Sequence, residues 1–261
     1  MKNNLNKISA KLRGQLVELS NKTKSAHLAS CLSSMDILVV LYEELIKNSS
    51  NRFIMSKGHA ANALYVTLAE FGYFDAELLN SIGKPGSKLE EHPAINCMPG
   101  VENASGSLGH GLPIATGLAL SNKIKNDNSK TFILMGDGEC NEGSIWEAAM
   151  FATAQKMKDL CVIIDFNKWQ ATGRSCEIMA LEPLREKWDS FGWNAIEIDG
   201  HNLEDISKAF KLVGKSDKPT AIIAHTVKGK GISFMEDDNN WHYRIPTEEE
   251  VVLAKKELGL I

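Results

Sequence analysis

Short apolar runs alternate with helical segments along the second half of the chain, and this alternation restricts the fold more than any other feature. Runs of strand length and composition lie at residues 131–135, 160–165, 194–198 and 220–224. The segments between them have helical character, at residues 145–157, 181–191 and 203–213. Strands joined by helices pair in parallel through right-handed crossovers, and helices then cover both faces of the sheet. The sequence therefore predicts an α/β fold with a parallel sheet.

The first third of the chain is expected to be helical. Segments whose apolar residues follow the helical period, or whose composition favours a helix, lie at residues 8–19, 35–46, 60–71 and 112–125. Glycine and proline interrupt regular structure between residues 73 and 111, and a loop this long inside a folded domain is usually functional. Because no linker or repeat is visible, we expect residues 1–261 to form a single domain with a helical N-terminal layer.

Charge and apolar content exclude several classes of partner. The 29 Lys and Arg residues against 33 Asp and Glu residues create no field that attracts nucleic acid. The longest apolar run, residues 37–42, is far below the ~20 residues of a spanning helix, and no apolar segment typical of a secretion signal follows the start. The five cysteines form no C-x-x-C pair. We therefore expect a cytoplasmic protein that binds neither nucleic acid nor membranes and has no zinc site.

Polar side chains follow the first two predicted strands. Asp137 lies between Gly136 and Gly138 after the first strand, and Asn167 follows the second. Ligands of open α/β sheets bind beyond the carboxyl ends of the strands, where a carboxylate and an amide oxygen would suit Mg²⁺ together with phosphate oxygens. The glycines would let backbone N–H groups approach those phosphates, and the helix that starts near Glu142 would add its positive N-terminus. These residues predict a site for a diphosphate with Mg²⁺.

Several motifs in the same order resemble the transketolase family. Residues 136–150 and 165–169 resemble its thiamine diphosphate motif, and further matches lie at residues 25–27, 56–60, 91–93, 99–111, 228–236 and 241–242. The resemblance covers the first of the three domains of a full-length transketolase. It implies the thiamine-diphosphate-binding fold of the PP type, the domain that holds the cofactor's diphosphate. It also implies that the chain is the N-terminal subunit of a split transketolase.

The resemblance assigns roles around the diphosphate. Asp137 and Asn167 would bind Mg²⁺ together with the backbone carbonyl of Trp169, and Gly138 would contact the diphosphate. Glu142 would lie at a subunit interface near the cofactor. These assignments agree with the diphosphate and Mg²⁺ site predicted from the strand ends alone.

The resemblance also implies contacts to the rest of the cofactor and to the sugar. Three residues match the family loop that contacts the cofactor's pyrimidine: Gly106, Ser107 and Leu108. Four histidines fall on motifs that line the sugar pocket, where imidazoles would hold or move protons: His27, His59, His92 and His242. Among these four, His59 and His242 would also contact the cofactor. His110 and Ala26 stand where the family usually has glutamine and glycine.

The implied activity is transfer of a two-carbon ketol unit from a ketose or ketose phosphate to an aldose, with thiamine diphosphate and Mg²⁺ as cofactors. In the family, the glutamate that acts on the aminopyrimidine belongs to the next domain. The chain is therefore expected to need a C-terminal transketolase subunit that carries the pyrimidine-binding and C-terminal domains, in an α2β2 assembly. The donor and acceptor sugars stay open, as does the choice between central pentose metabolism and a dedicated sugar pathway.

Three other functions are considered. The α-subunit of a 2-oxo acid dehydrogenase or decarboxylase shares the Gly-Asp-Gly motif, although the four histidines and residues 228–236 favour a transketolase. A nicotinamide-binding domain is disfavoured because residues 106–117 do not meet G-x-G-x-x-G and follow no strand. A non-catalytic cofactor-binding regulator stays open. Lys228 and Lys230 would lie either in a phosphate-binding loop or in a solvated turn over the site.

Overall fold

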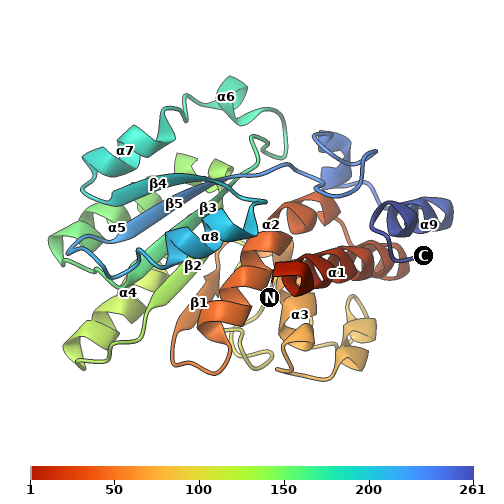
Figure 1. Cartoon of the computed structure of the whole chain (residues 1–261), viewed down its shortest axis with the longest axis horizontal. Helices are drawn as coiled ribbons and strands as arrows, with labels where there is room; N and C mark the ends of the chain where they lie inside the picture. Colours follow the sequence, from red (N-terminus) through yellow and green to blue (C-terminus); the bar gives the residue numbers. More distant parts are fainter. Residues whose placement is uncertain (1) are drawn as a thin grey trace.

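A five-stranded parallel sheet lies at the centre of the computed structural model, which describes residues 2–261 (Figure 1). Its strands are β1 (Arg52–Met55), β2 (Thr131–Gly136), β3 (Leu160–Phe166), β4 (Asn194–Asp199) and β5 (Thr220–His225). Their order across the sheet is β1-β2-β3-β5-β4, and every neighbouring pair is parallel. The predicted α/β fold with a parallel sheet is confirmed.

Helices cover both faces of the sheet, because successive strand residues point to opposite sides. Phe53 and Met55 of β1 join the apolar core under α1, α2, α3 and α8, whereas Ile54 joins the core under α4, α5 and α7. Figure 1 shows α1, α2 and α3 grouped beside one another at one side of the strands. The helices are α1 (Lys2–Thr23), α2 (Leu28–Leu41), α3 (Ala61–Glu70), α4 (Gly111–Ile124), α5 (Gly143–Ala154), α6 (Ser175–Ile178), α7 (Leu184–Ser190), α8 (Leu203–Phe210) and α9 (Glu248–Glu257).

Strand β1 and helix α9 are elements that the sequence patterns did not predict. Strand β1 interrupts the first third, which was expected to be helical, and its four residues are too few to show a strand period. Helix α9 packs against α1 near the C-terminus. Its start carries a capping box: the Glu250 N–H donates to the Thr247 hydroxyl at 3.2 Å, and Glu250 accepts the Thr247 N–H at 2.9 Å. The run Thr-Glu-Glu-Glu was therefore a signal that could have revealed this helix.

The other predicted helices are present with shifted ends. The helix expected over residues 181–191 begins at Leu184, because Pro183 disfavours helical backbone in the residue before it. The helix expected over residues 35–46 begins earlier, at Leu28, and ends in a π-helical turn, Tyr42–Ile46. Within residues 73–110 the only regular element is a short 3-10 helix, Ala76–Ser81, so this segment is confirmed as a long loop.

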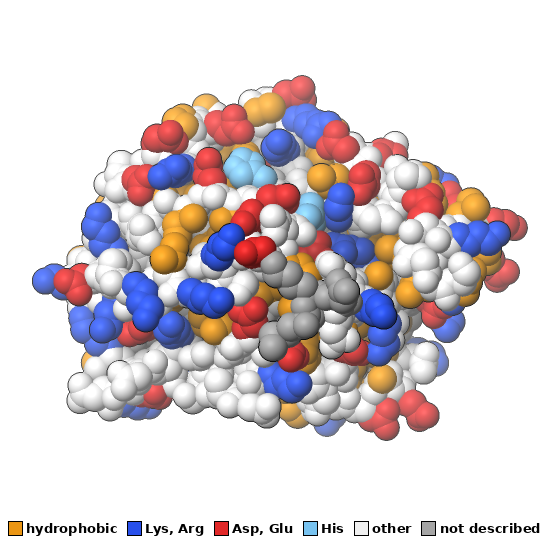
Figure 2. Space-filling view, in the orientation of Figure 1, with side chains coloured by type: hydrophobic (Ala, Val, Ile, Leu, Met, Phe, Trp, Pro, Cys, Tyr) orange, Lys and Arg blue, Asp and Glu red, His pale blue; other side chains and the backbone are white. Residues whose placement is uncertain are grey.

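Most of the tryptophans are buried, whereas most charged side chains lie at the surface. No helix within residues 2–261 combines the length and the apolar content that crossing a membrane requires. Figure 2 shows acidic and basic side chains interspersed over one face. Trp188, Trp193 and Trp241 are fully buried, and the partly buried Trp146 lies 5.3 Å from Trp188 between ring centroids. These four tryptophans therefore serve packing.

Candidate functional site

The candidate site lies where the carboxyl ends of β2 and β3 meet. These strands are neighbours, with Gly136 paired to Asp165, so Asp137 and Asn167 leave the same edge of the sheet side by side. A cavity of about 370 Å³ opens at this point, and both residues line it. The prediction that the two side chains converge is confirmed.

The cavity brings together almost all of the residues singled out from the sequence. These are His27, His59, His92, Gly106, Leu108, Asp137, Gly138, Glu142, Asn167, Trp169 and His242. Ser107 is exposed and is not among the residues that line the cavity. The cavity also contains residues that sequence reasoning missed, among them Ser30, Lys57, Glu139 and Gln170.

Asp137 is buried and held by hydrogen bonds. Its Oδ2 accepts the Ser175 hydroxyl at 2.8 Å and the Lys168 N–H at 3.1 Å, and its Oδ1 accepts the Gly138 N–H at 3.0 Å. Burial raises the pKa of Asp137 to about 6, because these hydrogen bonds oppose the cost of desolvation only in part. A divalent cation placed against this carboxylate would favour its ionised form.

The residues around Asp137 fit a metal-bound diphosphate. Within residues 2–261, no three His, Cys, Asp or Glu side chains gather in a metal-binding cluster, so a cation here would need mixed oxygen donors. One carboxylate, the Asn167 amide oxygen and the Trp169 carbonyl are the hard ligands that Mg²⁺ prefers. The Nε2 of Gln170 is buried without a hydrogen-bond partner, and a Cβ on Gly138 would lie 3.2 Å from the Gln170 side chain. An unpaired N–H donor beside a glycine suits phosphate oxygens.

Four histidines from separate segments meet on the other side of the cavity. The His27 ring centroid lies 4.9 Å from that of His242, 5.7 Å from His59 and 6.1 Å from His92. His27 has a left-handed backbone, with φ of 66°, and its N–H donates to the His242 carbonyl at 2.7 Å. The chain thus holds His27 in an uncommon conformation that directs it toward the other rings.

The environment keeps three of these histidines, His27, His59 and His242, neutral near pH 7. Burial, together with the charges of nearby lysines, lowers the pKa of His59 well below its usual value and that of His242 to about 3. Burial also lowers the pKa of His27, although Glu91 opposes the shift. The Lys228 ammonium lies 3.0 Å from the His242 Nδ1, which must then accept, so the neutral ring carries its proton on Nε2.

Acid is expected to destabilise the chain through His242. Its folded pKa of about 3 lies below the usual 6.5, so between these values the unfolded state binds a proton that the folded state excludes. Stability should therefore fall as the pH drops below about 6.5. Thermal unfolding from pH 8 to pH 5 should show a shallower pH dependence for His242→Gln than for the wild type. His225→Gln, which alters a half-exposed histidine, is the control, and equal slopes for wild type and His242→Gln would contradict the assignment.

Two buried carboxylates, Asp165 and Glu139, each form a hydrogen-bond network at the cavity walls. In the first, Lys57 pairs with Asp165, which also accepts the Ser33 hydroxyl at 2.6 Å. Burial alone would raise the pKa of Asp165, but Lys57 and these hydrogen bonds hold it below its usual value. Lys57 lies two residues after β1 and within the motif of residues 56–60, but its pairing with Asp165 was not predicted.

In the second network, Glu139 ties three cavity segments together. Its buried carboxylate accepts the Ser56 hydroxyl at 2.6 Å, the Gly109 N–H at 3.1 Å and the Gly136 N–H at 3.0 Å. It thereby joins the loop of Gly106 to the ends of β1 and β2. The sequence contained this residue within the family motif but offered no sign of its contacts.

The basic loop after β5 contains two lysines in different settings. Lys228 is fully buried and donates to Asn239 Oδ1 at 2.6 Å, so a solvated turn is wrong for this residue. Burial lowers the pKa of Lys228 to about 8. Lys230 is partly exposed and pairs with Glu236 at 3.2 Å.

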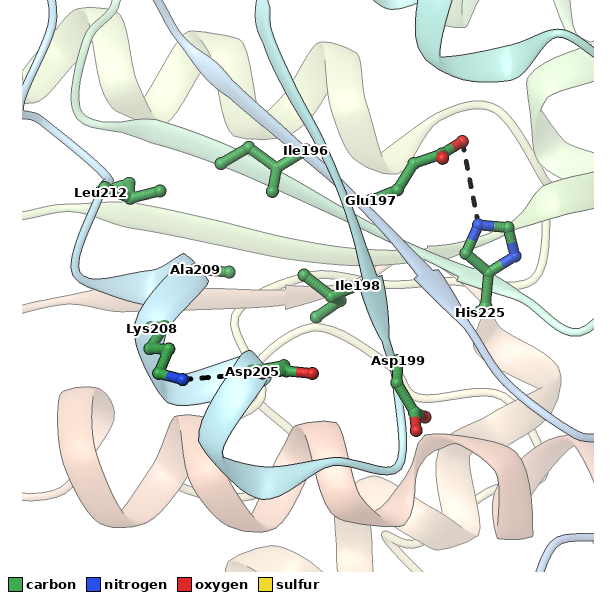
Figure 3. Close-up of a pocket in the computed structure, with 9 residues that line it drawn as sticks. All are labelled: Ile196, Glu197, Ile198, Asp199, Asp205, Lys208, Ala209, Leu212 and His225. Carbon is green, nitrogen blue, oxygen red and sulfur yellow. Dashed lines mark ion pairs between the residues drawn. The ribbon is translucent and has the colours of Figure 1, made fainter.

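A second hollow, of about 600 Å³, lies at the opposite edge of the sheet between β4 and α8 (Figure 3). Its charged side chains pair with one another, since Lys208 lies 3.9 Å from Asp205 and His225 lies 3.8 Å from Glu197. Strand β5 separates β4 from β3, so this hollow is remote from Asp137. It contains none of the residues predicted for the site.

Comparisons with known proteins agree with this geometry. Residues 6–261 match the family model described as the thiamine diphosphate binding domain of transketolase. One of the subunits of an apulose-4-phosphate transketolase from Phocaeicola vulgatus is 41% identical over 260 residues, which cover 96% of this chain and 92% of that protein. A 6-deoxy-6-sulfo-D-fructose transketolase subunit from a Clostridium species is 38% identical, with 95% and 93% covered.

The solved structures of transketolases share the fold but are longer. The transketolase from Campylobacter jejuni superposes with a TM-score of 0.90 at 31% identity, covering 98% of this chain and 43% of that chain. The present chain therefore spans less than half of that enzyme but nearly the whole length of the two similar subunits.

Proposed function

The chain belongs to the transketolase family through its thiamine diphosphate-binding domain, and from this premise we propose that it is the N-terminal subunit of a split transketolase. It would transfer a two-carbon ketol unit from a ketose or ketose phosphate to an aldose. One observation carries the proposal: four histidines line the same cavity as Asp137 and Asn167. A cation and diphosphate site next to a cluster of imidazoles suits cofactor-dependent sugar chemistry.

The metal side of the cavity would hold the cofactor. Asp137, Asn167 and the Trp169 carbonyl would bind Mg²⁺, and Gly138 and Gln170 would face the diphosphate. The loop of Gly106, Ser107 and Leu108 would contact the pyrimidine, and Glu139 would hold that loop in place. Bound thiamine diphosphate supplies a nucleophilic carbon for breaking and forming the sugar carbon–carbon bond.

The histidine side would handle protons of the sugar. His27, His59 and His242 are neutral near pH 7, so each ring offers one N–H donor and one acceptor. Lys228 directs the His242 proton to Nε2, which makes that atom the donor. These rings and His92 would bind sugar hydroxyls and move their protons, while burial excludes bulk water.

A partner subunit would complete the enzyme. Exposed apolar side chains lie on the packed helices α4 and α5: Ile114 is 40% exposed, Met150 54% and Phe151 43%. Glu142, at the N-terminus of α5, lies next to this surface and lines the cavity. We place the interface with a C-terminal transketolase subunit here, in an α2β2 assembly. The similarity to two proteins that are themselves named as subunits supports this arrangement.

The names of the similar subunits also favour one class of substrate for this chain. Both names specify sugars with an anionic group, a phosphate or a sulfonate. A ketose with such a group in a dedicated sugar pathway is thereby favoured over general pentose metabolism.

The cysteines are free throughout, which supports a cytoplasmic setting.

Purification of the chain from its native lysate with Mg²⁺ and thiamine diphosphate tests the function. We expect a stoichiometric partner, identified by mass spectrometry, and a complex that converts ketose phosphates but not 2-oxo acids. Turnover of 2-oxo acids would favour the dehydrogenase or decarboxylase α-subunit instead. Recovery of the chain alone with bound cofactor would favour the non-catalytic regulator.

A further inference from the structure

Residues 168–175 form a tight hairpin that brings Trp169 to the cavity. A β-bridge joins Trp169 to Arg174, and the Ser175 hydroxyl at the end of the hairpin donates to Asp137 Oδ2 at 2.8 Å. The hairpin therefore contacts the metal side of the site at both of its arms. Any movement of the hairpin would move the Trp169 carbonyl.

A three-residue contact, which we call the clasp, closes the outer side of this hairpin. The Arg174 guanidinium donates two hydrogen bonds to Asp237, both at 2.6 Å, and its Cζ lies 3.8 Å from the centroid of the Trp169 ring. The Trp169 Nε1–H donates to Asp237 Oδ1 at 2.8 Å. One carboxylate thus holds both strands of the hairpin.

Asp237 belongs to the loop that also carries the histidine side of the cavity. Its N–H donates to the Lys228 carbonyl at 2.8 Å, and Lys228 contacts His242. Asn239 adds a second link, because its Oδ1 accepts the Lys228 ammonium at 2.6 Å and its Nδ2 donates to the Ala171 carbonyl at 3.1 Å. The hairpin and the His242 segment are therefore joined at two points.

The exposure of the clasp indicates that it orients the hairpin rather than stabilises the fold. The side chains of Arg174 and Asp237 are 31% and 56% exposed, and ion pairs at such exposure contribute little to folding. Asp237 adopts a left-handed backbone, with φ of 58°, which is uncommon outside glycine, asparagine and aspartate. Its carboxylate is thus held toward the hairpin by an uncommon backbone conformation.

We propose that Asp237 is a positioning residue that fixes the hairpin, and with it the Trp169 carbonyl, for the metal. This inference rests on the proposed function, in which that carbonyl is a Mg²⁺ ligand. Residues that orient metal ligands without touching the metal commonly change metal affinity by about 10–100-fold when replaced. Such an effect requires only a looser hairpin and no loss of stability of the whole chain.

The test uses Asp237→Asn, because asparagine tolerates the left-handed backbone while losing the charged pair with Arg174. Thiamine diphosphate binding to the full chain with its partner is followed by calorimetry at increasing Mg²⁺. We expect the Mg²⁺ concentration for half-saturation to rise about tenfold. In the cofactor-free chain, trypsin should cleave after Lys168 or Arg174 several times faster, with an unchanged melting temperature.

Arg244→Ala is the matched control, since Arg244 also covers a tryptophan, Trp241 at 4.2 Å, and pairs with a carboxylate, Glu250, but does not touch the hairpin. It should leave the Mg²⁺ dependence and the tryptic cleavage after residues 168 and 174 unchanged. Equal Mg²⁺ dependence in wild type and Asp237→Asn would overturn the inference alone. Absence of thiamine diphosphate binding in the wild type would overturn the proposed function and this inference with it.

Discussion

Replacement of Asp137 by alanine is expected to abolish Mg²⁺-dependent binding of thiamine diphosphate, with a loss of at least about 100-fold in affinity. Asp137 is almost fully buried beside Asn167, so its carboxylate would face the cation without competition from bulk water. Calorimetric titration of the cofactor at several Mg²⁺ concentrations measures the effect. Asp137→Asn is the second variant, because it keeps the volume and an acceptor for Ser175 while removing the charge.

Asp199→Ala is the matched control for this prediction. Asp199 also ends a strand of the same sheet, but β4 lies at the edge and its end is exposed. Cofactor binding and its metal dependence should remain those of the wild type. If Asp137→Ala bound the cofactor with unchanged metal dependence, the metal site would lie elsewhere in the protein.

The purified chain alone is expected to transfer two-carbon units at least about 10³-fold more slowly than its complex with the partner subunit. The chain matches the first domain of transketolases and spans 43% of the solved enzyme from Campylobacter jejuni. A group that would act on the cofactor's aminopyrimidine would come from the partner, and loss of one such acid–base group commonly lowers rates by about 10²–10⁴-fold.

Reconstitution measures this second effect directly. The chain, the partner and their mixture are assayed with the same ketose phosphate and aldose at saturating Mg²⁺ and thiamine diphosphate. Activity should appear only in the mixture and should rise to a plateau at equal stoichiometry. Transfer by the chain alone at the rate of the mixture would contradict the split-enzyme proposal.

Local patterns were sufficient to predict the α/β class and the placement of Asp137 and Asn167 at one cavity. Strand and helix periods are set by neighbouring residues along the chain, and Asp137 and Asn167 follow strands whose apolar runs are plain. The family motifs also predicted the four histidines, all of which line the cavity. Strand β1 was missed because its four residues are too few to show a period.

Contacts between distant residues could not be predicted in the same way. Lys57 and Asp165 are both buried and compensate each other across 108 residues of sequence. The residues next to Lys57 or Asp165 in the sequence do not indicate that a charged partner will be present. Lys228 was compatible with a solvated turn until its burial against His242 was seen. A buried charge is stable only when the folded chain supplies its partner, and that pairing is a property of the whole fold.

The residue order alone was enough to establish the alternation of strands and helices and the glycine-flanked aspartate, because each depends on residues close together in the chain. The four histidines were identified by the resemblance of their motifs to the transketolase family. The tertiary structure decided which strand ends share a site. Strand β5 inserts between β3 and β4, which removes Asp199 from the cavity and leaves Asp137 beside Asn167. Strand order, the histidine cluster and the clasp at Asp237 depend on packing between segments far apart in sequence. The periodicity of neighbouring residues contains no information about such packing.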